Sequence, residues 1–504
     1  MDRGSSLFEL IKSLDKSQKR YFRLSISSDS NNYALLFDAM DSLKNYSETQ
    51  LRKKIDDKTI LKNLASEKGY LYELLLRSMR EYHQKKDLDA LIHGYLQDIR
   101  FLYEKTLYKA CKDRIRKSKQ VAIDSEKYTY VLEILHWERK LIKYASSDKF
   151  INSMNRIVAE RKEILEIILN EDFYQNAYEL VFSYQKSGIK DKEGMLEEVK
   201  KLLTNPVFSS VEQAKTLRAK TLYYSTKVRC LGMMNDHAGA FLHSKWHVEL
   251  YQTNPEYIIR DPKRYKTALY NLLNSFIDRI GEQDFNMYYA ELQGLPSENI
   301  SDEADRFDKL MFIKIRYHFS RLEVKAVLDM KEELESGFQK YLPYMDKTKQ
   351  IAFYYNLAIA HFLNADYANA LNYAERIVDL KMDSRVDIQH FVRILILIIH
   401  YEISPPKFVE HIYGVTYRYL YKYGLFNEFE GFVIAFIRKL RKIPDKLTLR
   451  EELIGLDIQL DELKAKGVST LGLEELSYWV KSKIQRKPML EIMRSKPQQG
   501  LPQD

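Results

Sequence analysis

Apolar side chains recur every three to four residues along most of this chain, and that period is typical of a helix with one buried face. In segment 66–145, for example, Leu71, Leu75 and Tyr82 form one apolar stripe, and the residues from Leu88 to Leu102 continue the same period. No stretch shows the strict alternation of a half-buried strand. The pattern therefore predicts an all-α fold.

Short polar turns separate the predicted helices, and this rhythm is typical of an α-solenoid of stacked antiparallel helical hairpins. A hairpin cannot bury its apolar face alone, so stacking in series creates a continuous core. About twenty helices fit this description. The main ones are expected at 7–14, 33–43, 128–144, 148–169, 172–186, 193–203, 211–231, 236–251, 285–292, 302–319, 323–341, 347–363, 367–380, 385–401, 407–423, 427–440, 447–464 and 473–486.

Breaks in the pattern suggest a division of the chain, although no long linker separates its parts. We expect an N-terminal helical cap over 1–60 and an array of helical hairpins over 61–205. A second helical array is expected over 206–486, after the break at Asn205-Pro206. The tail 487–504 contains three prolines and is expected to be flexible.

The segment Ile351–Leu380 contains the clearest repeat-like unit. Counting from its first residue, Tyr354 is fourth, Leu357 seventh, Ala358 eighth and Ala370 twentieth. The two alanines allow two helices to approach closely, and the tyrosine and leucine fill the space between them. A polar turn lies between these helices.

The same unit ends with Ala374 and Ile377 at the twenty-fourth and twenty-seventh positions, and its turn reads Asn364 to Tyr367. At these offsets the unit resembles a tetratricopeptide repeat. His361 stands where that family usually has an aromatic residue, Ala374 is smaller than usual, and no proline closes the unit. Segment 224–251 is a weaker echo. The whole chain also resembles long helical-repeat proteins of bacteria, a resemblance that implies no particular activity.

The resemblance implies an interaction scaffold or adaptor that holds a protein or peptide on the concave face of the array. In the best repeat, the inner face of the first helix would offer Ala352, Tyr355, Ile359 and Phe362, and the last three are the candidate partner-binding residues. The same apolar side chains would equally suit burial against a neighbouring helix. Both interpretations remain open at this stage.

Composition agrees with a helical protein in a reducing compartment. Glycine (17) and proline (11) are scarce for 504 residues, whereas turn-rich β folds need many of them. Two cysteines, Cys111 and Cys230, form neither a disulfide framework nor a zinc motif. The longest aliphatic run, Ile394–Ile399, is far shorter than the roughly 20 residues of a membrane span, and no secretory signal is evident. We expect a cytoplasmic protein with no membrane partner.

Two basic stretches provide an alternative function, the binding of nucleic acid. The net charge of +9 permits an acidic partner but is a mild bias at this length. Clustered cations can neutralise phosphates, and nearby tyrosine rings can stack on bases. The second stretch, at 438–450, would also be explained by the favourable placement of cations at a helix C-terminus. The candidate cations are Lys109, Lys112, Arg114, Arg116, Lys117 and Lys119 in stretch 109–119, and Arg438, Lys439, Arg441 and Lys442 in the second stretch.

Candidate chemistry is weak, and an enzyme is the least favoured function. His243 and His247 have the spacing of two metal ligands on one helix, but Lys245 lies between them and no glutamate follows the first histidine. Cys111 lies among cations that could lower its pKa, yet it equally fits the apolar side of a helix. No phosphate-binding glycine loop or nucleophile motif occurs. We therefore expect no catalytic residues, no cofactor and no metal.

Overall fold

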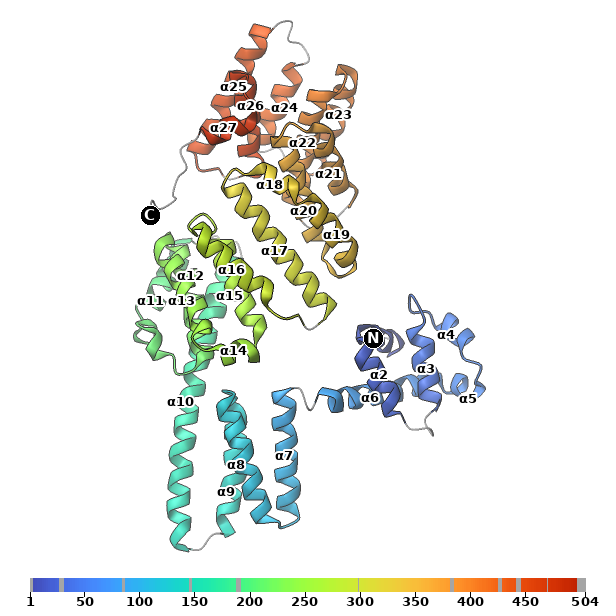
Figure 1. Cartoon of the computed structure of the whole chain (residues 1–504), viewed down its shortest axis with the longest axis vertical. Coiled ribbons are helices and arrows are strands. Elements are labelled where there is room, and N and C mark those ends of the chain that lie inside the picture. Colours follow the sequence, from blue (N-terminus) through green and yellow to red (C-terminus); the bar gives the residue numbers. More distant parts are fainter. Residues whose placement is uncertain are drawn as a thin grey trace. The chain divides into compact units, whose positions relative to one another are not determined.

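The computed structural model describes residues 3–26, 31–83, 87–144, 147–186, 192–297, 299–380, 385–424, 428–440, 446–468 and 470–495. Within these ranges the regular elements are helices α1 to α27, most of which are labelled in Figure 1, with a few short 3₁₀ turns and no strand. The prediction of an all-α fold is confirmed. None of the helices in the described ranges combines the length and the apolar character needed to cross a membrane.

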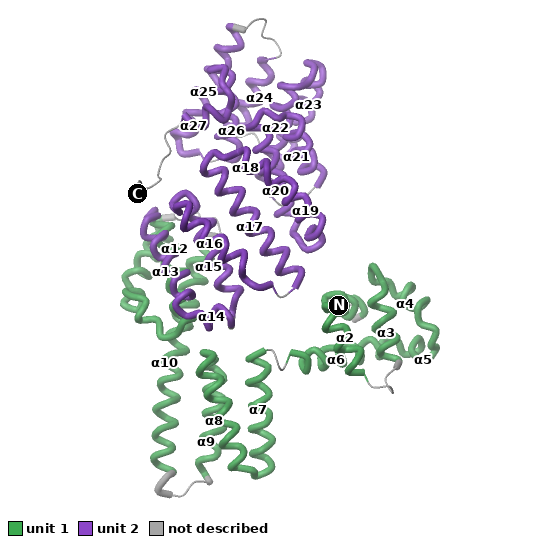
Figure 2. Tube along the Cα trace, in the orientation of Figure 1, with its two compact units in different colours: residues 1–234 green, residues 235–504 purple. Residues whose placement is uncertain are grey.

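The chain divides into two compact units, residues 1–234 and 235–504 (Figure 2). Unit 1 contains α1 (Arg3–Ser13), α2 (Lys16–Ser25), α3 (Asn31–Asp41), α4 (Glu48–Lys54), α5 (Lys58–Lys62), α6 (Leu64–His83), α7 (Leu88–Glu104), α8 (Tyr108–Asp124), α9 (Tyr128–Leu141), α10 (Ser147–Lys186), α11 (Lys192–Leu203) and α12 (Leu217–Met233). The division differs from the expected boundaries near residues 60 and 205.

Unit 2 contains the remaining helices. They are α13 (His237–Gln252), α14 (Pro255–Arg260), α15 (Pro262–Ser275), α16 (Glu282–Gly294), α17 (Ile300–Ser320), α18 (Val324–Asp329), α19 (Lys331–Tyr341), α20 (Lys347–Leu363), α21 (Tyr367–Asp379), α22 (Val386–Ile403), α23 (Pro406–Lys422), α24 (Glu428–Leu440), α25 (Lys446–Ala465), α26 (Leu473–Gln485) and α27 (Met489–Arg494). The expected helix at 323–341 is two helices, α18 and α19, which meet at Met330.

The first six helices share one hydrophobic core that includes Leu7, Phe22, Phe37 and Leu71. This core extends from α1 to α6, so the limit expected at residue 60 falls inside a packed cluster. Asp15 caps the start of α2 reciprocally. The Asp15 side chain accepts a hydrogen bond from the Gln18 backbone N–H, and the Gln18 side chain accepts one from the Asp15 backbone N–H. Local sequence therefore determines where this helix begins.

Helices α7 to α10 run side by side in Figure 1 and share a second core around Ile92, Ile115 and Ile134. The 40-residue α10 is continuous where the sequence predicted two helices, at 148–169 and 172–186. Ile164 of α10 packs in the α7–α10 core, whereas Val181 packs with α11 and α12. Because the apolar positions change face along α10, the change resembled a helix end in the sequence.

In unit 2, α26 packs against α20 and α25, and the indole of its Trp479 reaches α22. Trp479 is fully buried, and its Nε1–H donates to Glu402 Oε1 at 2.7 Å. Lys483 forms an ion pair with the other oxygen of Glu402 at 2.6 Å. Within the segment 487–504, expected to be a flexible tail, α27 follows α26 and buries Met489 and other apolar side chains. Residues 496–504 lie outside the described residues.

The same backbone turn recurs at several joints between helices. At each of these joints, a residue with φ near +60° follows the end of the helix, and this residue is not glycine. At two such joints, the N–H groups of Ala365 and Asp366 donate to Phe362 and His361, and those of Leu322 and Glu323 donate in the same pattern. This is the Schellman arrangement of a helix C-terminus. The recurring left-handed residues are Thr106, Glu126, Asn235, Leu322 and Ala365.

Two of these turns also share a side-chain contact. His361 Nδ1 lies 2.9 Å from Asp366 Oδ2, and His318 Nδ1 lies 2.8 Å from Glu323 Oε2. In both places a phenylalanine follows the histidine, and the acidic residue begins the next helix. The two hairpins are therefore alike in sequence and in geometry. This relation appears in the sequence only when offsets are counted from the turn rather than from the start of a helix.

Candidate binding surface on α8

The three apolar residues predicted to bind a partner lie inside unit 2. Tyr355 is 9% exposed, Ile359 4% and Phe362 1%. The Tyr355 hydroxyl donates to Glu475 Oε1 at 3.4 Å, and its ring lies edge-on to Phe391. In this structure the set belongs to the core, so the burial interpretation holds and the binding interpretation is corrected. Helix α20 is covered on nearly every side, which one repeat viewed in isolation could not reveal.

The first basic stretch lies on α8, whose cations divide into two groups. Arg114 and Lys119 point toward neighbouring helices, where Arg114 pairs with Asp98 at 3.4 Å and Lys119 pairs with Glu138 at 3.0 Å. The other four cations are exposed on the outer side, opposite the buried residues of α8. These four residues, called the cationic face, are Lys109, Lys112, Arg116 and Lys117.

Few contacts restrain the cationic face. Arg116 pairs with Asp113 of the same helix at 3.4 Å, and Lys117 lies 5.7 Å from the ring centre of Tyr95 on α7. Both members of the Arg116–Asp113 pair are well exposed, so solvent screens the attraction. Within the part of the chain that the structure describes, Lys109 and Lys112 have no ion pair. The face therefore presents positive charge to solvent.

A cavity of about 550 Å³ adjoins this face where α8, α9 and α10 meet. Arg156 and Lys119 both bind the carboxylate of Glu138. Burial raises the pKa of Glu138, but hydrogen bonds from these two cations outweigh burial and hold the pKa below its usual range. The cavity is thus lined by an ionised network with more cations than acids. Its lining residues are Lys112, Asp113, Ile115, Arg116, Lys119, Glu138, Leu141, Ile142, Ser153 and Arg156.

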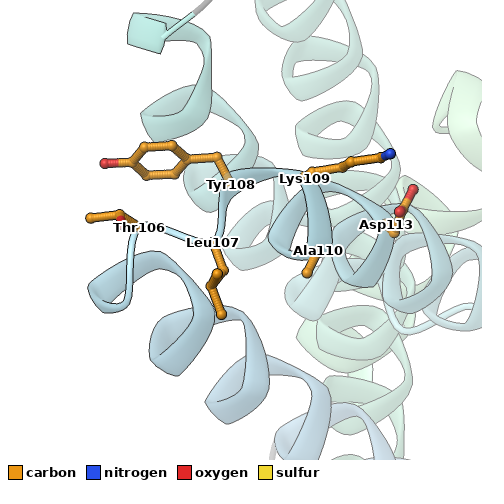
Figure 3. A pocket seen from close by; sticks show the side chains of 6 residues that line it. All are labelled: Thr106, Leu107, Tyr108, Lys109, Ala110 and Asp113. Carbon is orange, nitrogen blue, oxygen red and sulfur yellow. The ribbon is translucent and has the colours of Figure 1, made fainter.

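A more open pocket of about 610 Å³ lies at the start of the same helix. Figure 3 shows Lys109 and Asp113 pointing to one side of α8, whereas the ring of Tyr108 points to the other. Leu107, which precedes α8, is 53% exposed and supplies an apolar edge. Charge and apolar surface therefore lie together at this end of the cationic face.

The second basic stretch has a smaller described surface. Lys439 pairs with Glu452 at 2.8 Å, and Arg438 is exposed on the last turn of α24. Both cations lie at a helix C-terminus, where the helix dipole favours positive charge. Arg441 and Lys442 lie outside the described residues.

The cysteine and the two histidines considered as candidate reactive residues lie in packed helices. Cys111 is fully buried, its thiol donates to the Ile99 carbonyl at 3.5 Å, and burial raises its pKa. The apolar interpretation of this cysteine is thus supported against the reactive one. Burial lowers the pKa of His247 to about 4, and His243 contacts the Gly239 carbonyl through Nδ1 at 2.8 Å. The described residues contain no cluster of three potential metal ligands.

An aromatic surface on α23 was not predicted from the sequence. Tyr413, Tyr417 and Tyr421 stack along one side of this helix, with ring centres 6.1 and 6.3 Å apart and ring planes inclined by 22° and 11°. We call these three residues the tyrosine ladder. Tyr417 is 41% exposed and Tyr421 73% exposed. The four-residue spacing of these tyrosines is visible in the sequence, but spacing alone does not distinguish an exposed aromatic side of a helix from a buried one.

Comparison with known proteins does not assign the chain to a family. No protein-family model, no curated protein and no solved structure matches it.

Proposed function

We propose that this chain is a non-enzymatic interaction protein whose cationic face on α8 binds an acidic segment of a partner protein. The observation that carries this proposal is the exposure of Lys109, Lys112, Arg116 and Lys117 on one side of one helix. Such a surface steers an oppositely charged partner and selects it by charge. The open pocket beside Leu107 would accept an apolar side chain of the same partner.

The architecture in this proposal is a tetratricopeptide-like solenoid, as in long helical-repeat proteins of bacteria. It is supported by the recurring left-handed turn and by the two hairpins with a histidine–acid pair. A cytoplasmic location belongs to the same proposal, because both cysteines are buried free thiols, as expected in a reducing compartment. Binding through Tyr355, Ile359 and Phe362 is no longer part of it.

The proposal is tested by reversing three charges, Lys109→Glu, Lys112→Glu and Arg116→Glu, in the full chain. The tagged protein is purified from its native host, and the retained proteins are quantified by mass spectrometry. We expect an acidic partner to be depleted by about tenfold, equivalent to about 1.4 kcal/mol of binding free energy. Thermal unfolding should be unchanged, because these side chains lie outside the core.

A matched control reverses Lys44, Lys53 and Lys62, which are exposed in the α3–α5 region and change the net charge equally. The control should retain the partner. If both variants lose it to the same extent, the effect comes from net charge rather than from α8. If neither loses it, the proposed surface is wrong.

A further inference from the structure

We propose that α23 binds single-stranded nucleic acid along the tyrosine ladder. This surface lies in unit 2, and the inference does not depend on the acidic-partner proposal for α8 in unit 1. It rests on the order of the three rings, on the exposure of Tyr417 and Tyr421 and on the charges beside them.

The ladder places aromatic rings at regular intervals along α23. Tyr413, Tyr417 and Tyr421 are four residues apart, so each ring is about 6 Å farther along the helix axis than the previous one. Bases stacked in a strand are about 3.4 Å apart, so a strand that is extended to roughly twice that rise can place successive bases at successive rings. Stacking on such rings is tolerant of sequence, because every base has a π face.

Positive charge accompanies the ladder. Arg418 follows Tyr417 directly and Lys422 follows Tyr421, so each of the two exposed rings is followed by a cation about 100° around the helix. The Lys422 ammonium itself lies 5.4 Å from the ring centre of Tyr423. Both cations are exposed, as is Lys407 at the start of the helix. One acidic residue, Glu410, lies on the same side. A base can therefore stack on a ring while its phosphate meets the adjacent cation.

This pairing of ring and cation favours a polyanion over an apolar peptide. An apolar peptide gains its affinity from side chains inserted into pockets, and flat rings bordered by cations would bring it little charge complementarity. A strand of nucleic acid uses both features at once, the aromatic face for the base and the cation for the phosphate. RNA and DNA share this chemistry, and the experiment distinguishes them.

The test measures fluorescence anisotropy of labelled oligouridylate RNA and oligothymidylate DNA with the full-length chain. We expect binding at low salt that weakens as salt increases. The double substitution Tyr417→Leu and Tyr421→Leu should raise Kd at least tenfold, because leucine retains apolar area but loses the aromatic face. The substitutions Tyr417→Phe and Tyr421→Phe should preserve most of the affinity. Preference for RNA or for DNA identifies the natural strand.

Two controls keep the measurement specific. Tyr344→Leu removes an exposed tyrosine of unit 2 outside the ladder, where the ring is 51% exposed, and should leave Kd unchanged. If the double variant does not fold, the single variant Tyr421→Leu, at the most exposed ring, still tests the contribution of the ladder to binding. Circular dichroism before and after heating verifies that both variants are folded.

A second measurement concerns the cations. Replacing Arg418 and Lys422 with alanine should remove two phosphate contacts and reduce the slope of log K against log salt by about 1.4. No binding of either oligonucleotide at low salt would overturn the proposal, as would equal affinity in the leucine and wild-type chains. Loss of binding in the α8 charge-reversal variant would place the strand on α8 instead. If the ladder bound an acidic protein but neither oligonucleotide, it would be a protein-binding site and the proposal would be wrong.

Discussion

At the scale of single residues, the turns between helices place side chains where glycine is usual. Ala365 has φ of 59° and is exposed, yet it adopts the left-handed conformation at the C-terminus of α20. For a residue with a Cβ this conformation costs about 1–2 kcal/mol. The cap that follows holds the conformation, because the Asp366 side chain accepts a hydrogen bond from the Asn369 backbone N–H. These turns therefore contain strain that a substitution can release.

We predict that Ala365→Gly increases the free energy of unfolding by about 1 kcal/mol, because glycine adopts this φ without a steric penalty. Urea unfolding followed by circular dichroism measures the change. The control is Ala368→Gly, at an exposed position in the first turn of α21, which should lower stability by up to about 1 kcal/mol through helix propensity. Changes of opposite sign in the free energy of unfolding identify the turn conformation as the cause, whereas destabilisation by both substitutions would show that the turn is not strained.

Burial of individual residues was the least predictable property at this scale. The spacing of Tyr355 and Ile359 correctly placed them on one helix, but whether that face met solvent depended on Phe391 and Glu475, which lie far along the chain. Cys111 shows the same limit, since its neighbours in sequence are cations but its neighbours in space are apolar. Sequence periodicity indicates which residues share a face and does not indicate what covers it.

At the scale of elements, the joint before α26 has a strict requirement for glycine. Gly472 has φ of 89°, and a Cβ at this position would overlap the ring of Phe391 on α22. Gly467, a few residues earlier, has φ of 73° but open space around it. The first glycine allows α26 to approach α22, whereas the second serves the backbone turn alone.

Gly472→Ala should therefore destabilise unit 2 by about 3 kcal/mol, the sum of left-handed strain and overpacking. Gly467→Ala should cost about 1 kcal/mol, because strain is its sole penalty. Thermal unfolding of the two variants measures the difference. A similar loss in both would mean that Phe391 moves aside at little cost.

Helix limits were more predictable where local signals were strong. The expected helix at 347–363 matches α20, and 367–380 exceeds α21 by one residue, because Asp346 and Asp366 cap these helices. Prediction failed where the buried face changed without a break, as in α10. It also failed at Met330, where α18 ends and α19 begins without a glycine or proline. The exposed side of α8 was indicated by charge, whereas the cavity beside it depends on Arg156 of α10.

At the scale of the whole molecule, the chain contains two compact units, residues 1–234 and 235–504. Chains with more than one cooperative unit commonly depart from two-state unfolding. The core around Trp479 belongs to unit 2, and the cores around Leu7 and Ile92 belong to unit 1. Destabilisation of one interior should therefore leave the stability of the other largely unchanged.

We predict that calorimetry of the full chain shows more than one transition, with a total enthalpy larger than the van't Hoff enthalpy of any of them. Gly472→Ala should shift the transition of unit 2 to a lower temperature and leave another in place. If a single transition moved as a whole, the two units would unfold as one cooperative body, and this prediction would be wrong.

The unbroken α10 fixes the rotational register between two packed parts of unit 1. Ile164 packs in the core formed with α7–α9, and Val181 packs with α11 and α12, so one rigid rod aligns two interiors. Each residue added between them would rotate the second half by about 100° and withdraw its apolar side chains from their partners. An insertion of seven residues, close to two full turns, would preserve the alignment. Changes in the length of this segment that preserve folding should therefore come in steps set by the helical repeat.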